Sequence, residues 1–156
     1  MSPNDTSPLI DSQPPPLLRL ESVAVSFGGL RALGGVDLDV VRENYLTFSK
    51  ALPDTKVFYA VKANPAPEIL KLLAELGSSF DVASVSETEA VLAAGATPDR
   101  ISYGNTIKKV SEISAVARLG INLFAVDCEA EVDKVAAAAP GARVICRIHC
   151  DGTGSE

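Results

Sequence analysis

A lysine with reactive potential lies at Lys62, where an apolar run from Val57 to Val61 ends. Desolvation at the mouth of an apolar barrel disfavours the ammonium form and makes the neutral amine available. A neutral amine can attack an aldehyde carbon, as a Schiff-base lysine must. The alternative is a lysine at a strand end whose ammonium simply reaches solvent. The residues around Lys62 therefore decide between a Schiff-base lysine and a solvent-facing one.

Four further polar residues follow apolar segments in the same way. They are Asp81, Asn105, Asp127 and Arg147, and each lies at or just beyond the end of a different apolar run. If these runs are parallel strands, their carboxyl ends share one rim, where barrel enzymes collect their catalytic groups. An aspartate or asparagine in such a loop can instead cap the next helix, and for Asp127 we favour that capping role.

The segments that must position these residues alternate between strand and helix patterns. Prolines mark one helix entrance, glycines mark several helix ends, and Ser86 with Glu89 forms a capping box that opens another helix. The strands are predicted at residues 56–62, 79–83, 101–104, 122–126 and 143–148. The intervening helices are predicted to stop at Pro53, Gly77, Gly95, Gly120 and Pro140.

Five strands that alternate with helices through short loops predict an α/β fold with a parallel sheet and right-handed crossovers. A doubly wound open sheet and part of an eight-stranded barrel both have this order of elements. The polar residues at the strand ends favour the barrel. We therefore expect an incomplete (β/α)8 TIM-type barrel of about five βα units.

Composition narrows the class of partner. The net charge of -6 and the pI near 4.8 argue against nucleic acid and anionic membranes, and favour a small-molecule partner. No signal peptide or membrane span is recognisable, and the odd number of cysteines, 3, fits a reducing, cytoplasmic setting. Cys146, His149 and Cys150 form only one cluster of ligand types, so we predict no metal and expect Cys146 to be a buried strand residue.

The run from Phe58 to Pro65, continuing to Gly77, resembles the lysine signature of the ornithine, diaminopimelate and arginine decarboxylase family. Residues 80–84 with Glu87 are similar to a second family segment. Residues 101–105 with Lys108 and Lys109 are similar to a third segment, although we expect these two lysines to be a solvated loop pair. Arg147-Ile148 leading to Asp151-Gly152 resembles the ornithine/lysine branch.

This resemblance implies a barrel in which Lys62 holds pyridoxal 5'-phosphate as an internal aldimine, with the cofactor ring as the electron sink of a decarboxylation. It places the residues that match Asp81 and Arg147 beside the cofactor, and the one that matches Glu87 in support of them. The simpler alternatives are a helix cap for Asp81, a first-turn carboxylate for Glu87 and a strand-end charge for Arg147.

The implied substrate is a basic amino acid, ornithine or lysine, in polyamine biosynthesis, and the implied assembly of the full-length family is a homodimer. Family members carry further cofactor-binding residues beyond the point matched by Glu156. We therefore expect this chain to be a fragment that can be inactive alone. Its two open sheet edges predict self-association or aggregation.

Residues 17–33 resemble the opening of an ABC transporter ATPase of the branched-chain amino-acid importers, with Phe27 in the place of an adenine-stacking aromatic. No G-x-x-x-x-G-K-[ST] sequence follows, so an ATP site would lack its phosphate cradle. An amphipathic strand with a glycine turn is the simpler alternative. We divide the chain into a disordered tail at 1–16, an ATPase-like leader at 17–38 and a barrel domain at 39–156. The alternative functions are a truncated transporter ATPase and a non-catalytic pyridoxal-phosphate-binding protein.

Overall fold

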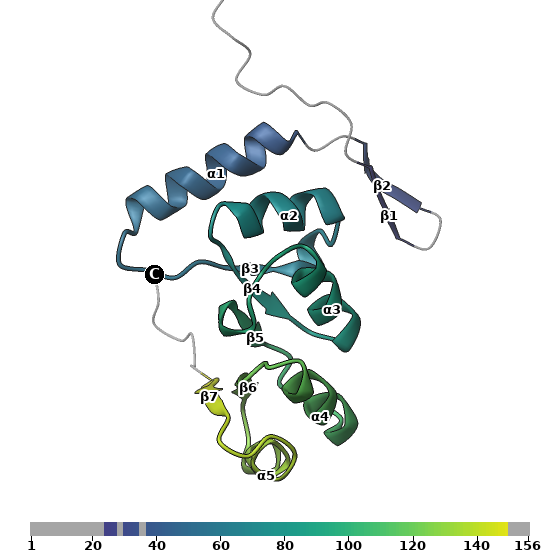
Figure 1. Cartoon of the computed structure of the whole chain (residues 1–156), viewed down its shortest axis with the longest axis vertical. Coiled ribbons are helices and arrows are strands. Elements are labelled where there is room, and N and C mark those ends of the chain that lie inside the picture. Colours follow the sequence, from purple (N-terminus) through teal and green to yellow (C-terminus); the bar gives the residue numbers. More distant parts are fainter. Residues whose placement is uncertain (1–23, 28–29, 35–36, 150–156) are drawn as a thin grey trace, which may run out of the picture.

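A computed structural model of the chain describes residues 24–27, 30–34 and 37–149 (Figure 1). The predicted tail at 1–16, residues 17–23, 28–29 and 35–36 of the leader, and Cys150 with the segment to Glu156 lie outside the described residues. Within the leader, β1 (Ala24–Phe27) and β2 (Leu30–Gly34) pair as an antiparallel two-stranded sheet. The register pairs Ala24 with Gly34 and shifts between Val25 and Ser26.

A parallel sheet of five strands carries the rest of the described fold. Each strand pairs with the next strand of the sequence, in the order β3-β4-β5-β6-β7, with β3 and β7 at the edges. This arrangement confirms the predicted α/β fold and the partial barrel. The strands are β3 (Phe58–Ala60), β4 (Ser79–Val82), β5 (Ile101–Tyr103), β6 (Leu123–Val126) and β7 (Arg143–Cys146).

One helix lies between each pair of neighbouring strands, and a further helix precedes β3. Figure 1 shows α2 to α5 following one another in an arc along one side of the strands, with α1 beside α2. None of the described helices is both long and apolar enough to cross a lipid bilayer. The helices are α1 (Leu38–Ala51), α2 (Pro67–Glu75), α3 (Val85–Ala93), α4 (Val110–Arg118) and α5 (Glu129–Ala138).

Side-chain alternation gives the sheet two different faces. Phe80 and Val82 of β4 are fully buried and lie in register with Ile101 and Tyr103 of β5, which face the helices. The Tyr103 and Phe124 rings follow at 6.1 Å between centroids. Alternation then places Asp81 and Ser102 on the opposite face, the interior face of a barrel. The helices complete the core with Ile69, Leu70, Leu73, Val91, Ile113, Val116 and Val135.

Helix α3 begins two residues earlier than the predicted capping box. Ser84 is the N-cap, with φ -152° and ψ 165°, and its Oγ accepts a hydrogen bond from Glu87 N at 3.2 Å. Glu87 Oε2 in turn accepts from Ala83 N at 2.7 Å. The predicted pair of Ser86 with Glu89 is therefore wrong, because Ser86 already lies inside the helix, where its hydroxyl cannot satisfy the first free amides.

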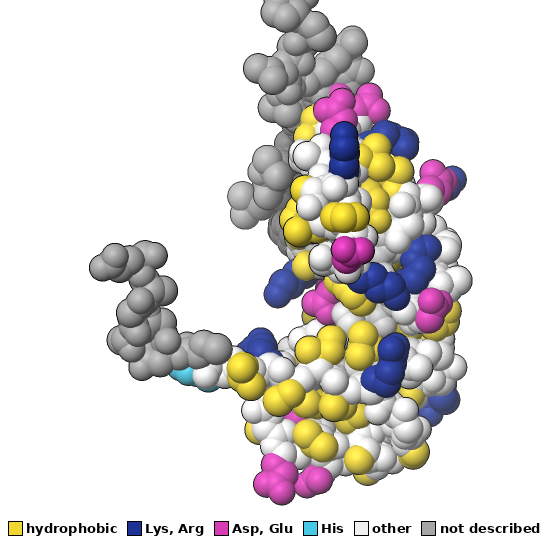
Figure 2. Space-filling model, turned by 90° about the vertical axis from the view of Figure 1, so that its left-hand side faces the viewer, with side chains coloured by type: hydrophobic (Ala, Val, Ile, Leu, Met, Phe, Trp, Pro, Cys, Tyr) yellow, Lys and Arg dark blue, Asp and Glu magenta, His cyan; other side chains and the backbone are white. Residues whose placement is uncertain are grey.

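The open side of the sheet leaves apolar residues in contact with solvent. All four residues of β7 are exposed, so the prediction that Cys146 is buried is wrong. In α1, Val41 and Tyr45 pack against the core, but Phe48 is 50% exposed. Figure 2 shows hydrophobic side chains gathered between charged ones on the side of the molecule that lies to the left in Figure 1.

Candidate active site

Lys62 lies just beyond the carboxyl end of β3, which is shorter than predicted. The chain leaves the extended conformation at Val61 and forms a 3-10 turn, Val61–Ala63. The Tyr59 hydroxyl donates to Asn64 O at 3.1 Å, and Ala66 N donates to Asn64 Oδ1 at 3.1 Å, so both bonds hold the chain that follows the turn. Burial raises the pKa of Tyr59, and the backbone of Asn64 lowers it in part.

The side chain of Lys62 is exposed, and no hydrogen bond or ion pair joins it to another described residue. The described residues therefore do not supply the desolvation that we expected around this amine. They leave it accessible to a carbonyl compound. The assignment of Lys62 as the cofactor-bearing lysine stays a prediction.

Asp81 lies one strand further along the same sheet, in register with Ala60 at the end of β3. Its carboxylate accepts a hydrogen bond from Ser102 Oγ at 2.7 Å, and a Cβ atom placed on Gly104 would overlap it. The alternative role as a helix cap does not hold, because Ser84 caps α3. Asp81 is thus fixed on the interior face by a serine and by the absence of a side chain at Gly104.

Replacing Gly104 with alanine is expected to push the Asp81 carboxylate away from Ser102, at a cost of about 1–3 kcal/mol in the free energy of unfolding. Urea denaturation measures this loss. The Asp81→Ala background is the control, because removal of the carboxylate removes the overlap. An equal loss from Gly104→Ala in both backgrounds would contradict the proposed clash.

Glu87 and Arg147 have contacts that fit their simpler roles. The Glu87 carboxylate is engaged by Ala83 N, as a first-turn acid at a helix N-terminus should be. The Arg147 guanidinium lies 3.7 Å from Asp127 Oδ2 and is 69% exposed. Both residues lie near the carboxyl ends of strands, at the same rim as Lys62. Their cofactor-binding roles stay predictions.

Asp127 does not cap α5, so our preferred role for it is wrong. The N-cap of that helix is Cys128, which makes no side-chain capping bond. Asp127 instead forms the ion pair with Arg147, because the parallel pairing of β6 with β7 brings the two strand ends together. Asp127, Arg147, Ile148 and His149 line a hollow at the rim.

The position of Lys108 differs most from the sequence prediction, in which Lys108 and Lys109 form a solvated loop pair. Lys109 is 81% exposed, as expected, but the Lys108 side chain is 0% exposed. Its ammonium donates to the backbone oxygens of Asn105 at 3.1 Å and Thr106 at 2.9 Å, and to Ala125 O of β6 at 2.5 Å. The same nitrogen lies 3.1 Å from Glu131 Oε2. The prediction of a solvated Lys108 is therefore wrong.

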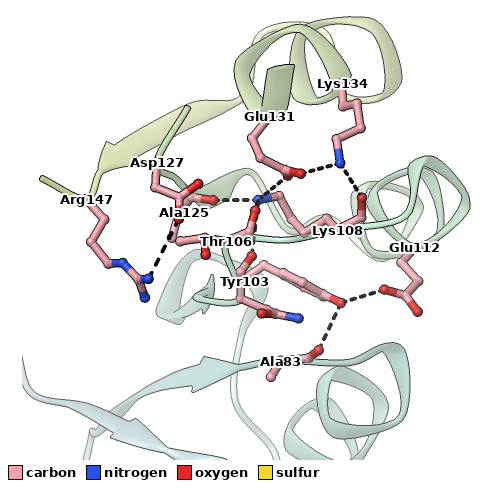
Figure 3. A network of polar contacts seen from close by, with 11 residues as sticks. Ala83, Tyr103, Thr106, Lys108, Glu112, Ala125, Asp127, Glu131, Lys134 and Arg147 are labelled. Atoms are coloured by element: carbon pink, nitrogen blue, oxygen red, sulfur yellow. Dashed lines mark hydrogen bonds and ion pairs between the residues drawn. The ribbon is translucent and has the colours of Figure 1, made fainter. Parts of the chain in front are cut away.

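Tyr103 joins two neighbouring rim segments (Figure 3). Its hydroxyl lies 3.0 Å from Ala83 O and 3.1 Å from Glu112 Oε2, so one proton serves two acceptors. Burial, followed by the negative charges of Glu112 and Glu87, raises the pKa of Tyr103 to about 12. The phenol therefore stays protonated at neutral pH and connects the loop after β4 with the first turn of α4.

A parallel barrel segment with a lysine, a carboxylate and an arginine near the carboxyl ends of its strands has the arrangement found in barrel enzymes, whose active sites lie at that rim. Comparison with known proteins identifies the family. Residues 38–155 match the family model described as pyridoxal-dependent decarboxylase, pyridoxal binding domain. Because this match covers more than half of the chain, the chain belongs to that family.

Individual relatives agree with the family assignment. The lysine/ornithine decarboxylase of Selenomonas ruminantium is 47% identical over 111 residues, which are 71% of this chain and 28% of that protein. Antizyme inhibitor 2 of Xenopus laevis is 45% identical over 118 residues, 76% of this chain and 26% of that protein. The chain therefore spans only about a quarter of the length of these curated relatives.

Solved structures show the same fold. A crystal structure of lysine decarboxylase from Selenomonas ruminantium superposes with a TM-score of 0.68 at 47% identity, over 71% of this chain and 29% of that one. The arginine decarboxylase of Paramecium bursaria Chlorella virus gives 0.71 at 28% identity, over 76% of this chain and 32% of that one. These matches agree with the predicted partial barrel of the decarboxylase amino-terminal domain.

Proposed function

We propose that this chain supplies the pyridoxal-phosphate-binding part of a decarboxylase that acts on ornithine or lysine in polyamine biosynthesis. The observation that carries the proposal is the family match over residues 38–155 together with an accessible lysine, Lys62, at the carboxyl rim of the sheet. Lys62 is proposed to hold the cofactor as an internal aldimine. The activity and the substrate are part of the proposal and not of the family assignment, because the chain spans only about a quarter of the length of its curated relatives.

The chemistry of the described residues fits this cofactor. When bound, pyridoxal phosphate supplies an electron sink for the electron pair that remains on the substrate when carbon dioxide leaves. Lys62 offers an amine with no described partner, and Asp81 offers a carboxylate that Ser102 and Gly104 hold in one position. A fixed carboxylate at the rim can orient a cationic group or accept a proton. Among the described residues, the Arg147 guanidinium makes one long ion pair, with Asp127, and can turn toward an anionic group.

Two related structures support a basic amino-acid substrate. A lysine/ornithine decarboxylase from Vibrio vulnificus is described in complex with putrescine, and the Selenomonas ruminantium enzyme in complex with pyridoxal phosphate and cadaverine. Both ligands are diamines. We extend to this chain a small amino-acid substrate, a cytoplasmic location and a homodimer as the assembly of the full-length family, with self-association of the chain through its open sheet edges.

The test of the cofactor site is chemical trapping. The 156-residue chain is incubated with pyridoxal phosphate, reduced with borohydride, digested and mapped by mass spectrometry. We expect the reduced adduct at Lys62 to form at lower cofactor concentration than at the exposed lysines Lys71 and Lys109. Absence of label from Lys62 at cofactor excess would remove the functional proposal.

A non-catalytic role is the second candidate. The observation in its favour is the 45% identity to a relative that is named an inhibitor and not a decarboxylase. Carbon dioxide release from labelled ornithine or lysine separates the two functions. Adduct formation at Lys62 without any release, in a chain completed with the remaining family domains, would favour the non-catalytic role. The transporter-ATPase alternative has no support from the family match.

A further inference from the structure

Lys108 is a buried cation whose hydrogen-bonding capacity is fully used (Figure 3). An ammonium has three protons, and three backbone oxygens accept them, those of Asn105, Thr106 and Ala125. Glu131 Oε2 lies 3.1 Å from the same nitrogen and supplies the opposite charge. The side chain thus connects the loop after β5 with β6 and with α5.

A second lysine strengthens the same connection. Lys134 Nζ donates to Lys108 O at 2.7 Å and pairs with Glu131 Oε1. Burial of the Glu131 carboxyl by itself raises its pKa, but the ammonium groups of Lys134 and Lys108 outweigh that effect and hold the pKa below its ordinary value. One carboxylate on α5 therefore lies between two cations, one of them completely buried.

The loop that Lys108 holds begins at Gly104, beneath the Asp81 carboxylate. Residues 104–109 form no helix or strand, so their backbone oxygens have no partners from a regular hydrogen-bond ladder of their own. Two of those oxygens, in the two residues after Gly104, are bound by Lys108. A shift of this loop moves Gly104 and with it the space that Asp81 occupies.

We propose that Lys108 is a positioning residue for the cofactor site, acting through the loop at 104–106 on the Asp81 carboxylate. This inference rests on the proposed function, because Asp81 is taken as a cofactor-binding residue. The Lys108 side chain is 0% exposed, and its ammonium is bound by three backbone oxygens and faces Glu131. Its role is to fix the position of the rim and not to touch the cofactor.

The test compares Lys108→Met with Lys109→Met, a neighbouring lysine that is exposed. Pyridoxal-phosphate affinity of the 156-residue chain is measured by absorbance titration well below the melting temperature of each variant. We expect Lys108→Met to weaken the affinity by at least about tenfold, which is the loss seen at metal sites when a residue that orients a ligand is replaced. Lys109→Met should leave the affinity unchanged. Equal affinities of folded Lys108→Met and the parent chain would overturn the inference.

A double-variant cycle separates positioning from general stability. In the Asp81→Ala background, Lys108→Met should weaken cofactor affinity no further, because the carboxylate through which it acts is gone. A full additional loss in that background would show that Lys108 does not act through Asp81, and the inference fails.

Hydrogen exchange distinguishes failure of the inference from failure of the proposed function. If the parent chain gives no adduct at Lys62, the proposed function fails, and faster amide exchange of residues 80–84 and 104–107 in Lys108→Met still supports positioning. Unchanged exchange there overturns it. If Lys108→Met does not fold, Lys134→Met removes the bond to Lys108 O together with the ion pair to Glu131, leaves the Lys108 ammonium in place, and should raise exchange of the same segments. No change in that variant also overturns the inference.

Discussion

Replacing Lys62 with arginine is expected to abolish the borohydride-trapped pyridoxal-phosphate adduct at this position. Arginine keeps the positive charge and most of the side-chain length, but its guanidinium does not lose a proton to give a nucleophilic amine. Label at the remaining lysines should stay at the level of non-specific reaction. The measurement is the molar ratio of reduced adduct to chain at limiting cofactor, with the labelled peptides identified by mass spectrometry.

The matched control is Lys71→Arg, because Lys71 is also exposed and lies on the neighbouring α2. This variant should retain the adduct at Lys62. Circular dichroism of both variants should match that of the parent chain, since an exposed lysine with no described partner contributes little to stability. Persistence of the full adduct ratio in Lys62→Arg would show that another amine holds the cofactor.

Replacing Glu131 with glutamine is expected to destabilise the fold by about 3–5 kcal/mol. The amide keeps the shape of the side chain but leaves the Lys108 ammonium, 0% exposed, without a compensating charge. The free-energy cost of desolvating this unpaired cation then destabilises only the folded state, because the ammonium is hydrated in the unfolded chain. Urea denaturation at neutral pH measures the loss, and Glu129→Gln, an exposed acid in the first turn of the same helix, is the control.

The pH dependence of stability is a second test of the contribution of the Glu131 carboxylate. The pKa of Glu131 is lower in the folded chain than its ordinary value of 4.5, so the folded state binds the proton less tightly than the unfolded state. Its stabilising contribution is fully present above 4.5 and is lost as the pH falls through the lowered folded value. Glu131→Gln should therefore show a flatter decline of stability across that acid range than Glu129→Gln.

Much of the fold could be predicted from local patterns. Short apolar runs and glycine stops placed all five parallel strands, because each strand pairs only with its sequence neighbours and needs no distant partner to be recognised. The predicted order of strands and helices also placed Lys62, Asp81 and Arg147 near the carboxyl ends of their strands. Errors of one or two residues arose at strand ends, as at Val61, where the chain turns before the apolar run is finished.

The contacts of individual polar residues were harder to predict. Lys108 is buried because Glu131, on the third element after it in the sequence, supplies the charge that lets it leave water. Nothing within a short window around Lys108 distinguishes it from the exposed Lys109. Asp127 was assigned to the helix that follows it, but its partner Arg147 comes from the next strand. Such pairs depend on tertiary packing and not on spacing along the chain.

The pairing of every strand of the parallel sheet with its immediate successor has a consequence for how the chain acquires its structure. Each new strand adds to an edge that is already present, so the entropy lost in closing a loop is limited to a single βα unit at every step. We expect the sheet to assemble in the direction of synthesis, one unit after another, as the ribosome releases it.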